Sequence, residues 1–207
     1  MQQFSETTMT LRPTPAEQRR PVLIPEPHAR SSKSLKKQHA DLRARSNALE
    51  SDRQAAARRR AEFSEALEQP DGDADIAGLA AEVRGDQLRL LRSELALRND
   101  LGSYLSDWHE SGRERVTSLR EELEATRADV LKRLIQIGYD DPATHRLSRS
   151  RVLPGDLNRH PRVVEARLSL VSQQGVLSDG PTVASNGVEL SEIRRLIQRE
   201  AAGLASV

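Results

Sequence analysis

The sequence contains no cysteine, so neither disulfide bonds nor thiolate metal sites can form. This absence is typical of proteins that work in a reducing compartment. Aromatic residues are almost as scarce, at 2% of the 207 positions. Because aromatic side chains supply large buried areas, the chain has little material for a compact globular core.

Long apolar runs are also missing. No stretch approaches the roughly 18 apolar residues that mark a membrane-spanning helix, so we expect no membrane span. The N-terminus lacks the basic region and the apolar core of a secretory signal, which predicts a cytoplasmic, intracellular protein. The formal net charge is only +1, which argues against a global attraction to nucleic acids or acidic membranes.

Charged and helix-forming residues, by contrast, are abundant. Charged residues make up 30% of the chain, and the composition leans toward Ala, Glu, Arg and Leu, as in long helices and coiled coils. No stretch shows the sustained alternation of a β-strand. The sequence therefore predicts an all-α protein: a disordered tail at 1–30, a long antiparallel helical hairpin or coiled coil at 31–138, and a small helical region at 139–207.

The predicted tail is rich in proline. Residues 1–30 hold five of the ten prolines, which neither a helix nor a central strand accommodates. Within it, Val22, Leu23 and Ile24 form an apolar triplet between prolines. This triplet is either a short docking motif for a partner's groove or a strip that packs on the protein's own helices.

The hairpin is predicted from a seven-residue repeat and a turn. Residues 31–69 contain neither glycine nor proline, and the sequence QPDGD at 69–73 is a strong turn signal before a second helical region at 74–138. The apolar repeat of the first helix consists of Leu35, Leu42, Leu49, Ala56 and Phe63. A short connection makes two long helices antiparallel neighbours.

The charge distribution supports the same hairpin. Residues 1–60 carry 13 basic and 6 acidic side chains, whereas residues 61–100 carry 4 basic and 10 acidic ones. Consecutive segments of opposite charge attract each other when they fold back.

The second helical region has an unusually wide apolar face between residues 88 and 108, which includes the only tryptophan of the chain. A helix with two adjacent apolar seams has more than one helical neighbour. We predict that this face stays incompletely covered in a monomer and becomes buried on assembly, because aromatic side chains anchor interfaces. The candidate interface residues are Leu90, Leu97, Leu101, Tyr104, Leu105 and Trp108.

The same region carries weak helix formers. Gly102 and Gly112 each cost a helix about 1 kcal/mol relative to alanine, and Ser111 with Glu114 resembles a capping box that would break the helix at 110–112. The apolar phase nevertheless continues unbroken across this stretch, so we favour one continuous helix. A glycine on the seam would let another backbone approach closely.

The C-terminal region is predicted to contain short helices between loops. We expect one helix at 142–149 and a longer one after Pro161. One face of the longer helix carries Val164, Leu168 and Val171. Residues 175–187 are expected to form a loop, and Asn186 with Glu189 resembles a capping box at the start of the last helix.

The sequence contains few candidate catalytic or ligand-binding residues. It has no phosphate-binding glycine loop and no nucleophile elbow, and its histidines lack helical ligand spacing. Asp140, Asp141 and His145 could bind a metal, but helix-capping aspartates beside a surface histidine are the favoured interpretation. We therefore predict a non-enzymatic protein with no metal or cofactor. An enzyme would require His145, His160 and Asp156 to converge in a cleft.

Two functions follow from these patterns. The first is a structural or adaptor role through helix–helix contacts, with a protein partner or with a second copy of the chain in a homo-oligomer. The alternative is association with nucleic acid through the basic first helix at 33–60. The residues that would carry this alternative are Lys33, Lys36, Lys37, Arg58, Arg59 and Arg60.

Overall fold

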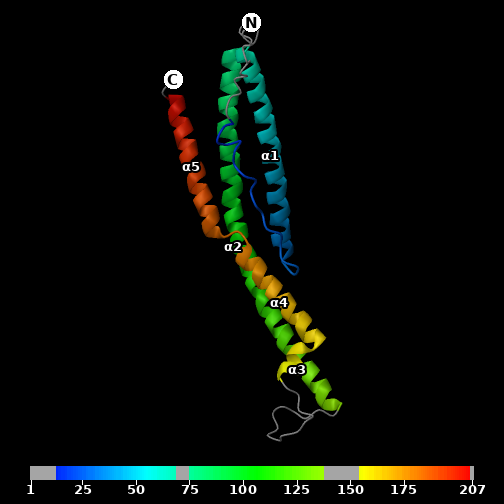
Figure 1. Cartoon of the computed structure of the whole chain (residues 1–207). Coiled ribbons are helices and arrows are strands. Elements are labelled where there is room, and N and C mark those ends of the chain that lie inside the picture. The colour runs from blue at the N-terminus through cyan, green and yellow to red at the C-terminus, as the bar shows by residue number, and fades with distance from the viewer. Residues whose placement is uncertain (1–12, 69–74, 138–153, 206–207) are drawn as a thin grey trace, which may run out of the picture. The chain divides into compact units, whose positions relative to one another are not determined.

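The computed structural model describes residues 13–68, 75–137 and 154–205. These residues form helices and no strand, which confirms the predicted all-α class (Figure 1). The helices are α1 (Lys33–Glu68), α2 (Ile76–Gln136), α3 (Pro154–Arg159), α4 (Pro161–Asp179) and α5 (Val183–Ala205). The predicted turn at 69–73 and the predicted helix at 142–149 lie outside the described residues.

The contacts divide the chain into two compact units. The hairpin unit contains the described residues of 1–26, 33–105 and 181–207. The α2–α4 unit contains those of 27–32 and 106–180. Helix α2 is continuous and contributes its first half to one unit and its second half to the other.

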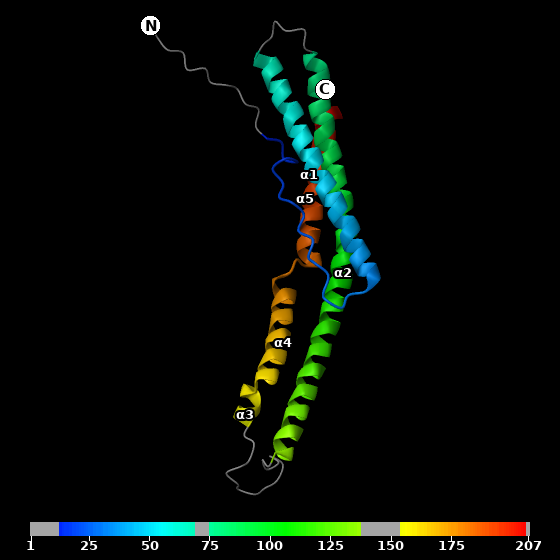
Figure 2. The same cartoon turned by 90° about the vertical axis from the view of Figure 1, so that its right-hand side faces the viewer.

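In the hairpin unit, α1 and the first half of α2 lie side by side and run in opposite directions (Figures 1 and 2). Ion pairs between the two helices show the antiparallel direction. Along successive pairs the residue number rises on α1 and falls on α2. The pairs are Arg45–Asp100, Arg53–Glu94 and Arg59–Asp86. The antiparallel hairpin and the attraction between its oppositely charged segments are therefore as predicted.

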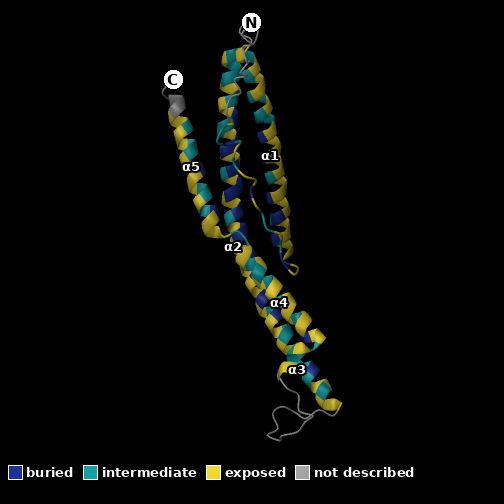
Figure 3. Ribbon diagram, viewed as in Figure 1, coloured by how far each residue is buried: buried dark blue, intermediate teal, exposed yellow. Residues whose placement is uncertain are grey.

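The core of the hairpin unit follows the seven-residue repeat (Figure 3). Leu35, Leu42, Leu49 and Ala56 of α1 are each 4% exposed. On α2, the buried apolar residues of the range 90–105 are Leu90, Leu91, Leu97, Leu101, Tyr104 and Leu105. Tyr104, for example, lies with its ring centroid 6.0 Å from that of His39 on α1.

This burial corrects the prediction of an open interface at 88–108. All six candidate interface residues, Leu90, Leu97, Leu101, Tyr104, Leu105 and Trp108, are at most 4% exposed within the single chain. The physical reason is that the chain supplies its own neighbours. In the hairpin unit, the Tyr104 hydroxyl donates to the carbonyl of Pro25 at 2.6 Å, and the Asn186 amide of α5 donates to the carbonyl of Arg98 at 2.7 Å.

The prediction of a disordered tail is wrong for residues 13–30. Together with 31 and 32 they form a segment without helix or strand that has turns at 15–17 and 29–30, and we call it the N-terminal strap. In the hairpin unit its Glu17 pairs with Arg60 of α1, and its Val22 is 7% exposed. Val22 therefore packs on the protein's own chain, while Leu23 is 69% exposed. Proline excludes helix and central strand, but it leaves an extended chain free to pack and to form ion pairs.

In the α2–α4 unit, the second half of α2 runs antiparallel to α4. Arg162 donates to Asp129 at 2.7 Å near the start of α4. Gly112, earlier on α2, faces Leu177 near the end of α4. Val163 is fully buried on this side of α4.

Two local predictions in this region need correction. The loop expected at 175–187 is confined to 180–182, because α4 continues to Asp179 and α5 begins at Val183. The capping pair is also different: Thr182 and Ser185 exchange hydrogen bonds at 3.0 and 3.1 Å. The α2 helix runs unbroken through 110–112, as favoured from its apolar phase.

Candidate functional site

A buried cluster of charged side chains lies in the hairpin unit, centred on the Glu94 carboxylate of α2. Only 1% of the Glu94 side chain is exposed. Three guanidinium groups surround it, and each comes from a different part of the fold. They belong to Arg19 of the strap, Arg53 of α1 and Arg98 of α2 itself. We call these four residues the Glu94 cluster.

The cluster satisfies the acceptor capacity of the carboxylate. Arg19 Nε lies 2.9 Å from both Glu94 oxygens. Arg53 Nη2 donates to Oε2 at 2.8 Å, and Arg98 Nε donates to Oε1 at 2.8 Å. An ionised carboxylate offers about four lone-pair sites, so these contacts fill it. The three arginine side chains are at most 10% exposed.

The seven-residue pattern explains how these charges reach the core. Arg53 lies on α1 between Leu49 and Ala56, at a seam position where an apolar residue is expected. Glu94 lies on α2 between Leu90 and Leu97 in the same way. Antiparallel pairing brings the two positions together. The sequence analysis missed this site, although opposite charges at seam positions of two facing helices were a usable signal.

The Glu94 cluster carries two more positive than negative charges, and acidic residues at its edge offset them. Glu189 of α5 pairs with Arg19 and also lies 3.5 Å from Arg98, while Glu192 of α5 lies 3.5 Å from Arg19. Burial lowers the pKa of Arg19, but its hydrogen bond to Glu94 and these neighbouring carboxylates raise that pKa overall. Guanidinium groups remain protonated in proteins, so the cluster provides charge and hydrogen bonds rather than proton transfer.

The α2–α4 unit holds a second buried site, around Trp108, which is 1% exposed. The Trp108 ring packs against Gly180, where an added Cβ would lie 2.6 Å from a ring carbon. The His28 ring of the strap lies 4.6 Å from the Trp108 ring, centroid to centroid. Gly112 leaves room for His28, since a Cβ there would lie 2.6 Å from His28 Nε2.

Both ring nitrogens of His28 have partners. Nε2 lies 3.0 Å from the carbonyl oxygen of Trp108, and the Gln173 amide nitrogen lies 2.9 Å from Nδ1. This pattern assigns the neutral tautomer with its hydrogen on Nε2. Burial lowers the pKa of His28, although the bond to the Trp108 carbonyl opposes this shift. His28 is thus a packed, neutral side chain rather than an available base.

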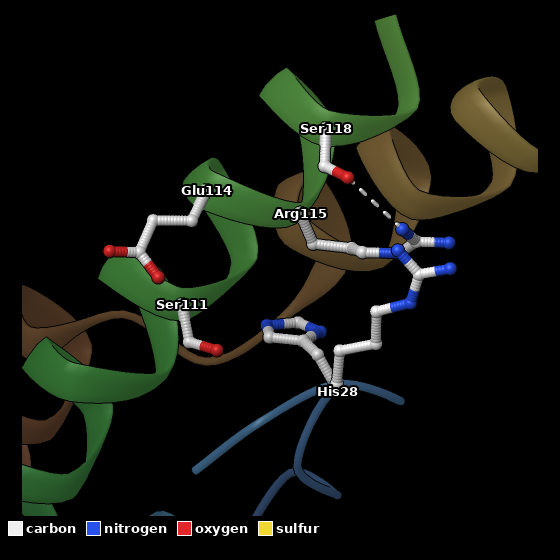
Figure 4. A pocket seen from close by; sticks show the side chains of 6 residues that line it. His28, Ser111, Glu114, Arg115 and Ser118 are labelled. Atoms are coloured by element: carbon white, nitrogen blue, oxygen red, sulfur yellow. Dashed lines mark hydrogen bonds between the residues drawn. The ribbon is translucent and has the colours of Figure 1, made fainter. Parts of the chain in front are cut away.

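A small pocket of about 150 Å³ opens beside His28 in the same unit (Figure 4). Arg30 and Arg115 both donate to Glu122, at 2.9 and 3.0 Å. The hydrogen bond from Arg115 is the main reason why the pKa of Glu122 is lowered. The remaining pocket residues are Ser111, Glu114 and Ser118. Because the two carboxylates, Glu114 and Glu122, balance the charges of the two arginines, the pocket has no excess charge for a ligand.

Helix α4 carries the most evident exposed apolar surface of the α2–α4 unit. Val164, Leu168 and Val171 are 36%, 64% and 56% exposed. Their spacing of four and three residues places them on one face, whereas Val163 lies on another face and is buried. We call these three residues the α4 outer stripe. The sequence analysis grouped them on one face, but the structure turns that face outward.

The basic residues of the nucleic-acid alternative do not form one patch. Arg59 pairs with Asp86, and Arg60 pairs with Glu17. The other four, Lys33, Lys36, Lys37 and Arg58, are exposed. The lysines and the arginine triplet are separated along α1 by about 35 Å, at 1.5 Å per helical residue.

Metal and catalytic candidates from the sequence find little support. Within the described ranges, no group of three His, Asp or Glu side chains is arranged to hold a metal. Asp140, Asp141 and His145 lie outside these ranges. His160 caps α4, where its Nδ1 accepts a hydrogen bond from the Arg162 backbone at 3.3 Å.

A comparison with protein-family models finds no match, and comparisons with curated proteins and with solved structures find none either. In the described part of the chain, none of the helices combines the length and the apolar character needed to cross a bilayer.

Proposed function

We propose that this chain is a non-enzymatic structural or adaptor protein that works through helix–helix contacts and associates with a second copy of itself. The contact surface is the α4 outer stripe rather than the buried 88–108 face. A cytoplasmic location, predicted from the sequence, belongs to the same proposal.

The exposed stripe is the observation that carries this proposal. Val164, Leu168 and Val171 are exposed on α4, while Val163 on another face of the same helix is fully buried. A helix that is apolar on two sides calls for two neighbours. Covering apolar surface is favourable by about 25 cal/mol per Å². The stripe therefore favours a further helix as its partner.

The charges beside the stripe favour a second copy as that partner. Glu165 and Arg167 are exposed on α4, next to the stripe. A surface with both signs of charge around an apolar centre is complementary to itself. Such self-complementarity is what a two-fold interface requires.

Sedimentation velocity over a hundredfold concentration range tests the proposal. We expect the wild-type chain to shift from monomer to dimer, and Leu168→Glu to weaken the dimer by more than about tenfold, which corresponds to 1.4 kcal/mol. Ser169→Glu is the matched control, because it adds the same charge to an exposed position of α4 that is neither three nor four residues from any stripe residue. A wild-type monomer at every concentration, or a dimer that survives Leu168→Glu, would contradict the proposal.

A further inference from the structure

Helix α5 is held in the hairpin unit by a short recognition segment. Asn186 and Ile193 are 4% and 0% exposed, and Glu189 lies between them on the same face. The Asn186 amide donates to the Arg98 carbonyl, and Glu189 pairs with Arg19 and Arg98. Outside this face the helix is open, with Val188 71% exposed. About two helical turns therefore carry the contact.

The surface that receives this segment is organised without α5. Glu94 holds Arg19 and Arg98 through their Nε atoms. Their Nη2 atoms, which are not bonded to Glu94, lie toward Glu189. A preorganised pair of guanidinium groups loses little entropy on binding, so this surface is suited to an amphipathic helix with carboxylates on its contact face.

The connection to α5 is short, and its Gly180 packs against the Trp108 ring of α2. Residues 180–182 link α4 to α5, and they include Gly180, in an extended conformation, and Pro181. Proline prevents the two helices from continuing as one regular helix. A terminal helix on a short hinge is the kind of element that two copies of a chain exchange.

We propose that the Arg19–Arg98 surface is a docking site for an amphipathic helix that presents carboxylates on its contact face, and that its partner in trans is the α5 helix of a second copy. The complementarity of this contact is already present within one chain, because exchange recreates the same pairs between Glu189 and the two arginines. The inference rests on the proposed self-association, but it uses a different surface from the α4 outer stripe.

A labelled peptide with the sequence of residues 181–205 tests the proposal by fluorescence anisotropy with the full-length chain. In the wild-type chain the resident α5 competes with the peptide, which lowers the apparent affinity. The full-length double variant Glu189→Gln/Glu192→Gln has a weakened resident helix and an intact receiving surface. We expect it to bind the wild-type peptide about tenfold more tightly than the wild-type chain does.

Three controls keep the outcome specific. A peptide with both glutamates replaced by glutamine should lose binding, and a Glu200→Gln chain should behave like wild type, since Glu200 contacts Arg199 rather than the receiving surface. A second weakened chain, Ile193→Ala, loses the apolar anchor instead of the charges and should also bind the peptide more tightly. Equal affinity of all chains for the peptide, or no binding to any, would overturn the inference.

The α4 outer stripe is tested separately. The Leu168→Glu chain should bind the peptide as the wild-type chain does, because Leu168 belongs to the other unit. Failure of peptide binding with retained, Leu168-dependent dimerisation removes the exchange of α5 and leaves the proposed function standing. Peptide binding without Leu168-dependent dimerisation removes the α4 outer stripe as the contact surface and leaves the docking of α5 standing.

Discussion

Replacement of Gly112 by alanine should destabilise the α2–α4 unit, although alanine is the better helix former. In a helix interior, glycine to alanine alone gains about 1 kcal/mol. Here the new Cβ would lie 2.3 Å from Leu177 Cδ2 and 2.6 Å from His28 Nε2. Favourable contacts between carbon atoms lie at about 3.5 to 4.0 Å, so the neighbours must move by about 1 Å.

The His28 ring cannot move that far at little cost. It is bonded to the Trp108 carbonyl at 3.0 Å and to Gln173 at 2.9 Å. Overpacking costs about 1 to 3 kcal/mol, and a lost hydrogen bond adds about 1 kcal/mol. After the helix-propensity gain of about 1 kcal/mol is subtracted, Gly112→Ala should lower the free energy of unfolding by about 1 to 3 kcal/mol.

Gly175→Ala is the matched control, because it lies in a helix of the same unit and an added Cβ meets nothing within 4 Å. It should raise the free energy of unfolding by up to about 1 kcal/mol. Urea unfolding followed by the fluorescence of Trp108, the only tryptophan, measures both variants. A Gly112→Ala chain as stable as the wild type would refute the close packing of His28 and Leu177 against α2.

Two further predictions concern buried groups. Glu94→Gln should lower the free energy of unfolding by about 3 to 5 kcal/mol, because it leaves three buried guanidinium groups without their shared carboxylate. In urea unfolding, the control Glu121→Gln, at an exposed position, should change the free energy of unfolding by less than about 0.5 kcal/mol. Similar losses in both variants would contradict the role of the Glu94 cluster. Burial lowers the pKa of His28, so the imidazole binds a proton more readily in the unfolded chain, and the free energy of unfolding should fall as the pH drops below about 6.5, the pKa of an unfolded histidine. Urea unfolding between pH 8 and 5.5 should show a weaker pH dependence of stability in His28→Gln than in the wild type. An unchanged pH dependence would exclude His28 as its source.

The sequence was sufficient for the helices of the hairpin because their determinants are local. A repeat such as Leu35, Leu42 and Leu49 marks one face of a helix wherever it packs. The unbroken apolar phase likewise predicted that α2 continues past Gly112. The sequence could not show which groups pack against Gly112, because His28 and Leu177 are distant from it in the chain.

The Glu94 cluster could not be found in the same way because it depends on pairing between segments. Arg19 comes from a proline-rich stretch whose composition alone resembles a disordered tail. The position of Arg19 follows only from the folded hairpin, which brings Arg53 and Glu94 together. The Glu94 carboxylate then has further acceptor sites that Arg19 can fill. Composition reports which local structures a segment cannot form, but not which distant charges it will meet.

The width of the 88–108 face was interpreted correctly as a need for several neighbours, and only their source was wrong. In the hairpin unit that need is met by α1, by the strap and by α5, each with at least one specific contact to α2. The same reasoning, applied to α4, gives a different result. Val163 is fully buried, whereas Leu168 on another face of α4 is 64% exposed. A helix with two apolar faces has two neighbours, and we propose that a second copy of the chain supplies the second neighbour of α4.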